Sequence, residues 1–153
     1  MFTKYTPKYL LCAAIFAALL AATTYSQTKL LRFPDIHGDR VAFTYGGDIW
    51  TAPAAGGTAN RLTAHPGVEV FAKFSPDGKW MAFESMQAGP KQIWLRDMES
   101  GKTQVVSGGN CNSSSPEWEE DSRTLIFASD CGRGLGLPVL YRASLPLSNL
   151  IYH

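Results

Sequence analysis

The two cysteines Cys111 and Cys131 have the clearest chemical potential in this sequence, because a pair of thiols can form a disulfide. In an exported chain a disulfide is the natural interpretation of such a pair. Closing a loop of this size would stabilise the fold by about 3 kcal/mol on chain-entropy grounds. Two free, partly buried thiols are the alternative. A metal site is not expected, because it needs more ligands nearby, and His37 and His65 are not at ligand spacing.

Carboxylates are the second group that could do chemistry, and they gather near Asp121. The cluster consists of Glu117, Glu119, Glu120 and Asp121. Paired carboxylates can act as general acid and base, but a solvated strand edge is the favoured interpretation. No G-x-S-x-G, H-E-x-x-H or Walker motif is present, and the glycines of 132–136 do not open a helix after a strand, as phosphate binding requires. We therefore expect no catalytic residue, no metal and no cofactor in this chain.

A turn between two short strands is the element that organises the chain. Phe71–Phe74 and Trp80–Ser85 have the alternation of strands, and the turn motif Ser75-Pro76-Asp77-Gly78 lies between them. Proline presets φ, aspartate bonds its own backbone, and glycine takes positive φ without a Cβ clash.

This unit is repeated without gaps. A constant shift of 44 positions (74 to 118) aligns Phe74 with Trp118, Asp77 with Asp121, Met81 with Leu125, Phe83 with Phe127, Ile49-Trp50 with Ile93-Trp94, Gly57 with Gly101, and Leu62-Thr63 with Val106-Ser107. Four short strands in each unit of about 40–45 residues are typical of a β-propeller blade. A β-sandwich also has short strands with regular turns, but it does not explain the ungapped repeat.

The predicted fold is therefore all-β, with about three antiparallel four-stranded blades at 28–66, 67–112 and 113–153. Strands are expected at 29–33, 60–63 and 103–107, among others, and a degenerate copy of the turn motif is expected to begin at Pro34. Closed propellers typically have four to eight blades, and three blades leave open sheet edges. The chain is thus expected to be an incomplete propeller, part of a larger protein.

The first 26 residues are predicted to be a secretory signal peptide. Lys4 and Lys8 precede the apolar run Tyr9–Ala22, and small polar residues follow it. The run is shorter than the roughly 20 residues that span a bilayer. An uncleaved anchor is the alternative, and it would be the chain's only membrane contact. The region 27–153 is then periplasmic or secreted. The formal charge is +1 and no basic cluster is present, so nucleic-acid binding is not expected.

Two sequence stretches resemble known families. The motif F-S-P-D-G-K-x-x-A-F at 74–83, followed by Ile93-Trp94, resembles the propeller repeats of TolB, a periplasmic protein. The run PDIHGDRVAFTYGGDIWTAPAAGGTANRLTAHPG, at 34–67, is similar to the first blade of tricorn-type peptidases. The tricorn resemblance implies a serine peptidase in full-length relatives, with its catalytic machinery in domains after the propellers. No position of this chain matches that machinery.

The blade pattern also predicts where recognition occurs. Loops between second and third strands grow from Phe43–Trp50 to Phe83–Trp94 to Phe127–Tyr141, whereas the opposite turns hold their length. Variation on one rim suggests that this rim binds proteins or peptides, although the loops could simply tolerate drift. Both cysteines are expected there. The function predicted is a non-catalytic exported binding module, and the alternative is the gating propeller of a tricorn-like peptidase.

Overall fold

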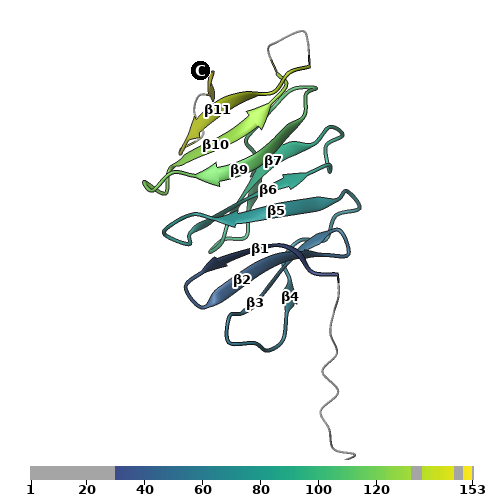
Figure 1. Cartoon of the computed structure of the whole chain (residues 1–153), viewed down its shortest axis with the longest axis vertical. Coiled ribbons are helices and arrows are strands. Elements are labelled where there is room, and N and C mark those ends of the chain that lie inside the picture. The colour runs from purple at the N-terminus through teal and green to yellow at the C-terminus, as the bar shows by residue number, and fades with distance from the viewer. Residues whose placement is uncertain (1–29, 132–135, 147–149, 153) are drawn as a thin grey trace, which may run out of the picture.

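The computed structural model describes residues 30–131, 136–146 and 150–152, and in this part the chain forms three antiparallel sheets of four strands each (Figure 1). The strands are β1 (Arg32–His37), β2 (Arg40–Tyr45), β3 (Asp48–Pro53), β4 (Asn60–Arg61), β5 (Glu69–Phe74), β6 (Trp80–Ser85), β7 (Gln92–Asp97), β8 (Thr103–Val105), β9 (Ser113–Trp118), β10 (Thr124–Ser129), β11 (Val139–Ser144) and β12 (Leu150–Tyr152).

Each sheet is a meander in which strands that follow one another in the chain are hydrogen-bonded neighbours. The sheets are β1-β2-β3-β4, β5-β6-β7-β8 and β9-β10-β11-β12, which we call blades 1, 2 and 3. They stack in chain order (Figure 1). This arrangement confirms the predicted all-β fold of about three propeller blades that do not close into a ring.

One hydrogen-bond pattern recurs where the third and fourth strands meet. The backbone N–H of Ile49 donates to the hydroxyl of Thr63 at 2.9 Å, and the N–H of Ile93 donates to the hydroxyl of Ser107 at 2.8 Å. The amides at 62–63 and 106–107 in turn donate to the carbonyls of Ile49 and Ile93. Because both amides converge on one carbonyl, regular pairing stops, and β4 and β8 end two residues earlier than expected.

The prediction for the first strand was wrong. β1 continues through Pro34 to His37 and leaves only Gly38 and Asp39 for the turn to β2, so this turn is shorter than its equivalents at 75–79 and 119–123. The register of β1 against β2 shifts between Arg32 and Asp35, and Phe33 has a φ of 54°. A bulge therefore lets the strand pass the proline without losing its pairing.

The core lies between blades, and the middle blade is buried on both faces. Met81 and Phe83 of β6 pack towards blade 1, in a cluster with Ala42, Ile49, Ala72 and Phe74. Ala82, between them in sequence, packs towards blade 3, in a cluster with Ile93, Leu95, Val106, Leu125, Phe127, Tyr141 and Ala143. Because successive side chains of a strand point to opposite faces of the sheet, β6 contributes to both interfaces between blades.

Among the described residues, one face of blade 1 and one face of blade 3 have no neighbouring blade. Ile36 of β1 is 65% exposed, whereas Phe74, at the corresponding position of β5, is 6% exposed. Leu140 of β11 is 65% exposed, whereas Ile93, at the corresponding position of β7, is fully buried. In the part of the chain that the structure describes, these two outer faces therefore carry residues at interface positions but have no neighbouring blade.

The predicted signal segment, residues 1–26, lies outside the described residues. Within the described residues, no helix is long and apolar enough to cross a membrane.

Candidate functional site

The turn motif at 75–78 is held by a compact set of hydrogen bonds. The hydroxyl of Ser75 donates to Oδ1 of Asp77 at 2.6 Å and accepts the backbone N–H of Trp80 at 3.0 Å. Oδ1 of Asp77 also accepts the backbone N–H of Lys79 at 3.1 Å, and the N–H of Gly78 donates to the carbonyl of Ser75 at 2.8 Å. The Ser75 hydroxyl and the Lys79 amide hold the pKa of Asp77 below its ordinary value of 3.8.

Replacing Asp77 with asparagine is expected to make stability less sensitive to acid. A carboxylate whose pKa is lower in the folded state stabilises the fold above its unfolded pKa, and this contribution is lost as the pH falls through the folded value. Urea unfolding at pH 7 and pH 3 should therefore show a smaller difference for Asp77→Asn than for the wild type. The matched control is Glu120→Gln, because Glu120 is exposed and its side chain makes no polar contact with other described residues. Equal pH differences in wild type and Asp77→Asn would contradict this role.

The third blade builds the same turn with other residues. Ser122 takes the position of Gly78, and both have positive φ, 57° and 69°. Oδ1 of Asp121 accepts the backbone N–H groups of Arg123 at 2.8 Å and Thr124 at 2.7 Å, and Oδ2 accepts the hydroxyl of Thr124 at 2.7 Å. These bonds, the Thr124 hydroxyl first, lower the pKa of Asp121. Asp121 is therefore a turn residue in the described structure.

Two other members of the carboxylate cluster, Glu117 and Glu119, form ion pairs with neighbouring strands. Glu117 pairs with Lys73 at 3.0 Å, and both carboxylate oxygens of Glu119 lie 2.6 Å from Nη2 of Arg142. In the part of the chain that the structure describes, no three His, Cys, Asp or Glu side chains are arranged to hold a metal ion.

Two rims border the blades. We call the rim formed by the described residues of the second-to-third-strand loops (46–47, 86–91, 130–131 and 136–138) and the connections between blades (62–68 and 106–112) the loop rim. The opposite rim, which contains the 75–78 motif, is the turn rim. Two open pockets lie along the turn rim, of about 610 Å³ between blades 2 and 3 and about 320 Å³ between blades 1 and 2. Lys79 and Trp80 line both.

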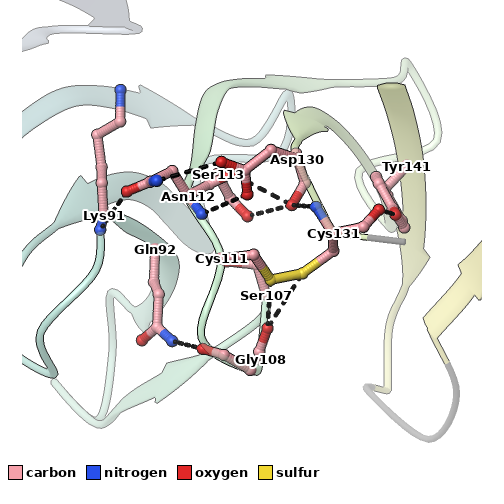
Figure 2. The surroundings of a disulfide bond; sticks show 12 residues. Lys91, Gln92, Ser107, Gly108, Cys111, Asn112, Ser113, Asp130, Cys131 and Tyr141 are labelled. Carbon is pink, nitrogen blue, oxygen red and sulfur yellow. Dashed lines mark hydrogen bonds between the residues drawn. A yellow bond between two sulfur atoms is a disulfide. The ribbon is translucent and has the colours of Figure 1, made fainter. Parts of the chain in front are cut away.

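The structure places the two cysteines of the predicted disulfide next to each other on the loop rim. Cys111 leaves blade 2 in the connection 106–112, Cys131 begins the long loop of blade 3, and Figure 2 shows the disulfide between them. Their Cα atoms are 5.3 Å apart, within the range of natural disulfides.

Hydrogen bonds surround this disulfide, and some of them join the same two segments. The backbone N–H of Asn112 donates to Oδ1 of Asp130 at 2.7 Å, and the N–H of Asp130 donates to the carbonyl of Asn112 at 3.0 Å (Figure 2). The side-chain amide of Gln92 donates to the carbonyl of Gly109 at 3.0 Å, and the hydroxyl of Tyr141 donates to the carbonyl of Cys131. The loop of blade 3 therefore starts from a fixed base.

A charged ladder runs along the first strands of the three blades, and sequence reasoning missed it. Nζ of Lys73 in β5 lies 3.8 Å from Oδ1 of Asp35 in β1 and 3.0 Å from Oε1 of Glu117 in β9. Oδ2 of Asp35 also accepts the backbone N–H of Phe74 at 2.9 Å. The signal that could have found it is the opposite charge of Lys73 and Glu117 at aligned positions.

The first strands also share a backbone feature. Phe33, Phe71 and Ser115 occupy one repeat position, and all have a φ between 54° and 57°. Each lies where its strand loses register with the next strand. The rings of Phe33 and Phe71 approach to 3.9 Å between centroids, so the bulges place side chains of neighbouring blades in contact.

The fold and the sites together define an open series of β-propeller blades. The blades contact one another through their first strands, and a disulfide links blades 2 and 3 on the loop rim. The family described as the tricorn protease N-terminal beta propeller domain matches residues 28–143, and the chain belongs to this family. The resemblance to tricorn-type and TolB-like repeats is thus confirmed. The matched region is a non-catalytic part of tricorn-type proteins, whose catalytic domain lies elsewhere.

Two relatives show how much of a longer protein the chain covers. Tricorn protease homolog 1 of Streptomyces coelicolor is 33% identical over 111 residues, which are 72% of this chain and 10% of that protein. A putative tricorn-like protease N-terminal subunit of Sulfurisphaera tokodaii is 31% identical over 104 residues, which are 61% of this chain and 50% of that protein. The chain therefore spans no more than half the length of these relatives.

Two solved structures have the same fold. The crystal structure of the tricorn protease aligns with a TM-score of 0.69 and 25% identity, over 80% of this chain and 13% of that chain. The structure of putative TolB from Agrobacterium tumefaciens aligns with a TM-score of 0.68 and 18% identity, over 81% of this chain and 50% of that chain. The second likeness shows the fold alone.

Proposed function

We propose that this chain is an exported, non-catalytic propeller module that binds proteins or peptides through its loop rim. The observation that carries the proposal is the position of large exposed apolar side chains. Tyr45, Val68, Met86 and Leu137 are all exposed, and all lie on or beside the loop rim. Exposed apolar side chains that gather on one surface typically mark interaction sites.

The disulfide supports the same rim and the exported location. It fixes the base of the longest second-to-third-strand loop, and a fixed loop loses less conformational entropy on binding. Disulfides persist in oxidising compartments, which agrees with the predicted signal segment.

Serine substitutions of exposed apolar residues can test the rim. The variant Leu137→Ser removes one of these side chains from the loop rim, and Ile36→Ser removes a similarly exposed side chain near the turn-rim end of β1. We expect the immobilised wild-type protein and the second variant to retain a similar fraction of a random short-peptide library, and the first variant to retain several-fold less. Equal losses in both variants would show that retention follows general hydrophobicity and not the loop rim.

The family match favours a second candidate function, the gating propeller of a tricorn-like serine peptidase whose catalytic domain is in another part of the protein or another subunit. The two candidates are separated by the gene. An open reading frame that continues past the codon for His153 into a serine-peptidase region supports the peptidase, and a frame that continues only through further blades supports the binding module.

A further inference from the structure

A cavity of about 250 Å³ lies between blades 1 and 2, bordered by the loop-rim segments 62–68 and 86–91. Residues 62–65, which lead from blade 1 towards blade 2, form one wall, and residues of blade 2 form the other. Two charged side chains of opposite sign line it, Glu69 at the start of β5 and Arg96 near the end of β7.

Glu69 is buried without full compensation for its charge. Its side chain is 2% exposed, and its Oε2 atom has no hydrogen-bond partner among the described residues. Burial raises the pKa of Glu69 above its ordinary value, and the neighbouring carboxylate of Asp48 adds to the shift. The hydroxyl of Thr63, the side chain of His65 and the hydroxyl of Ser85 oppose it only in part. A cationic group placed beside Glu69 would therefore be stabilised.

Arg96, whose charge is opposite to that of Glu69, has a buried donor without a hydrogen-bond partner among the described residues. Its Nε atom is buried without a hydrogen-bond partner, and no carboxylate of the described chain forms an ion pair with its guanidinium. Leaving a buried donor or acceptor without a partner costs about 1–3 kcal/mol, and more for charged groups. One cavity is thus lined by a carboxylate and a guanidinium, and one atom of each, Oε2 of Glu69 and Nε of Arg96, lacks a hydrogen-bond partner in the described structure.

The buried polar atoms without hydrogen-bond partners are confined to one region of the described structure. The buried side-chain atoms without hydrogen-bond partners in the described residues belong to Thr44, Asp48, Glu69, Trp94 and Arg96, all in blades 1 and 2. At the junction of blades 2 and 3 the buried carboxylate of Glu84 instead accepts the backbone N–H of Ser115 at 2.7 Å and pairs with Lys91 at 3.4 Å.

We propose that this cavity binds a short zwitterionic peptide of about two residues, with its ammonium group at Glu69 and its carboxylate at Arg96. The inference rests on the proposed function, because it specifies the class of peptide that the module takes. The volume suits such a ligand, and its two termini would supply the donor and the acceptor that the cavity lacks. Gln87 and Thr103, which also line the cavity, offer further hydrogen bonds.

Blocked dipeptides test both ends of the ligand separately. By isothermal titration calorimetry the wild-type protein is expected to bind Ala-Ala about tenfold more tightly than N-acetyl-Ala-Ala or Ala-Ala amide, because each blocked form loses one charge-assisted hydrogen bond. Equal affinity for the free and blocked forms, or no binding of Ala-Ala, would overturn the proposal.

Two variants should each remove one of the two ligand preferences and keep the other. Glu69→Gln should remove the preference for a free amino terminus and keep that for a free carboxylate, whereas Arg96→Gln should do the reverse. Partial unfolding would weaken all three ligands together. The controls are Glu117→Gln and Arg123→Gln, the same changes at positions that do not line the cavity, and both preferences should persist in them. Loss of either preference in the controls would overturn the assignment.

The peptide-library experiment separates failure of this inference from failure of the proposed function. Retention of library peptides on the loop rim without Ala-Ala binding would overturn the zwitterion site and leave the module's function in place. Failure of both experiments would overturn both.

Discussion

Replacing Phe83 with alanine is expected to lower the free energy of unfolding by about 3–5 kcal/mol. The Phe83 side chain is fully buried in the cluster between blades 1 and 2. Truncation removes most of the ring's apolar area and leaves a hole that the flanking strands can fill only partly. Urea unfolding followed by tryptophan fluorescence should show an earlier midpoint with an unchanged slope.

Phe71→Ala is the matched control, because it makes the same chemical change on the adjacent strand β5. Phe71 is partly exposed and its main aromatic contact is Phe33, so a loss of about 1 kcal/mol is expected. A comparable loss in both variants would mean that the junction of blades 1 and 2 is not the packed core described above.

Removing the disulfide is expected to cost about 3 kcal/mol. Cys111 and Cys131 are separated by 20 positions, and a link across a loop of this length restricts the unfolded chain by about that amount. The protein should be purified under oxidising conditions without added reductant. Its urea midpoint is then expected to fall on adding reductant, and Cys111→Ser/Cys131→Ser should unfold at the reduced midpoint.

The double variant is also the internal control, since reductant should leave its midpoint unchanged. A thiol assay on the denatured, unreduced protein gives an independent count of free cysteines. A wild-type midpoint that does not respond to reductant would falsify the proposed stabilising role of the disulfide.

The repeat was predictable from the sequence because its determinants are local. The Ser75–Gly78 turn depends on side chains that bond to their own backbone, and alternation in Trp80–Ser85 reports a strand buried on both faces. The aligned pair Thr63 and Ser107 proved to have the same hydrogen-bonding role. Features that repeat in sequence therefore repeated in structure.

Several of the misses concern bulges and contacts between blades, which have little local signature. Phe33, Phe71 and Ser115 adopt positive φ without being glycine, so composition gave no sign of the bulges. The buried Glu69 lies at the start of a strand, and nothing in its neighbouring sequence indicates the cavity it shares with Arg96. Sequence reasoning predicted the blades more fully than the spaces between them.

The ladder of Asp35, Lys73 and Glu117 bears on how many blades a complete ring would have. Its charges run negative, positive, negative along consecutive blades, and a fourth blade that continued the pattern would place Lys or Arg beside Glu117. Around a closed circle, alternating signs match at every junction only if the number of members is even, and an odd circle forces two like charges together. Each exposed ion pair contributes about 0–1 kcal/mol, so the preference is small. Every junction of a ring that kept this pattern would nevertheless favour an even number of blades.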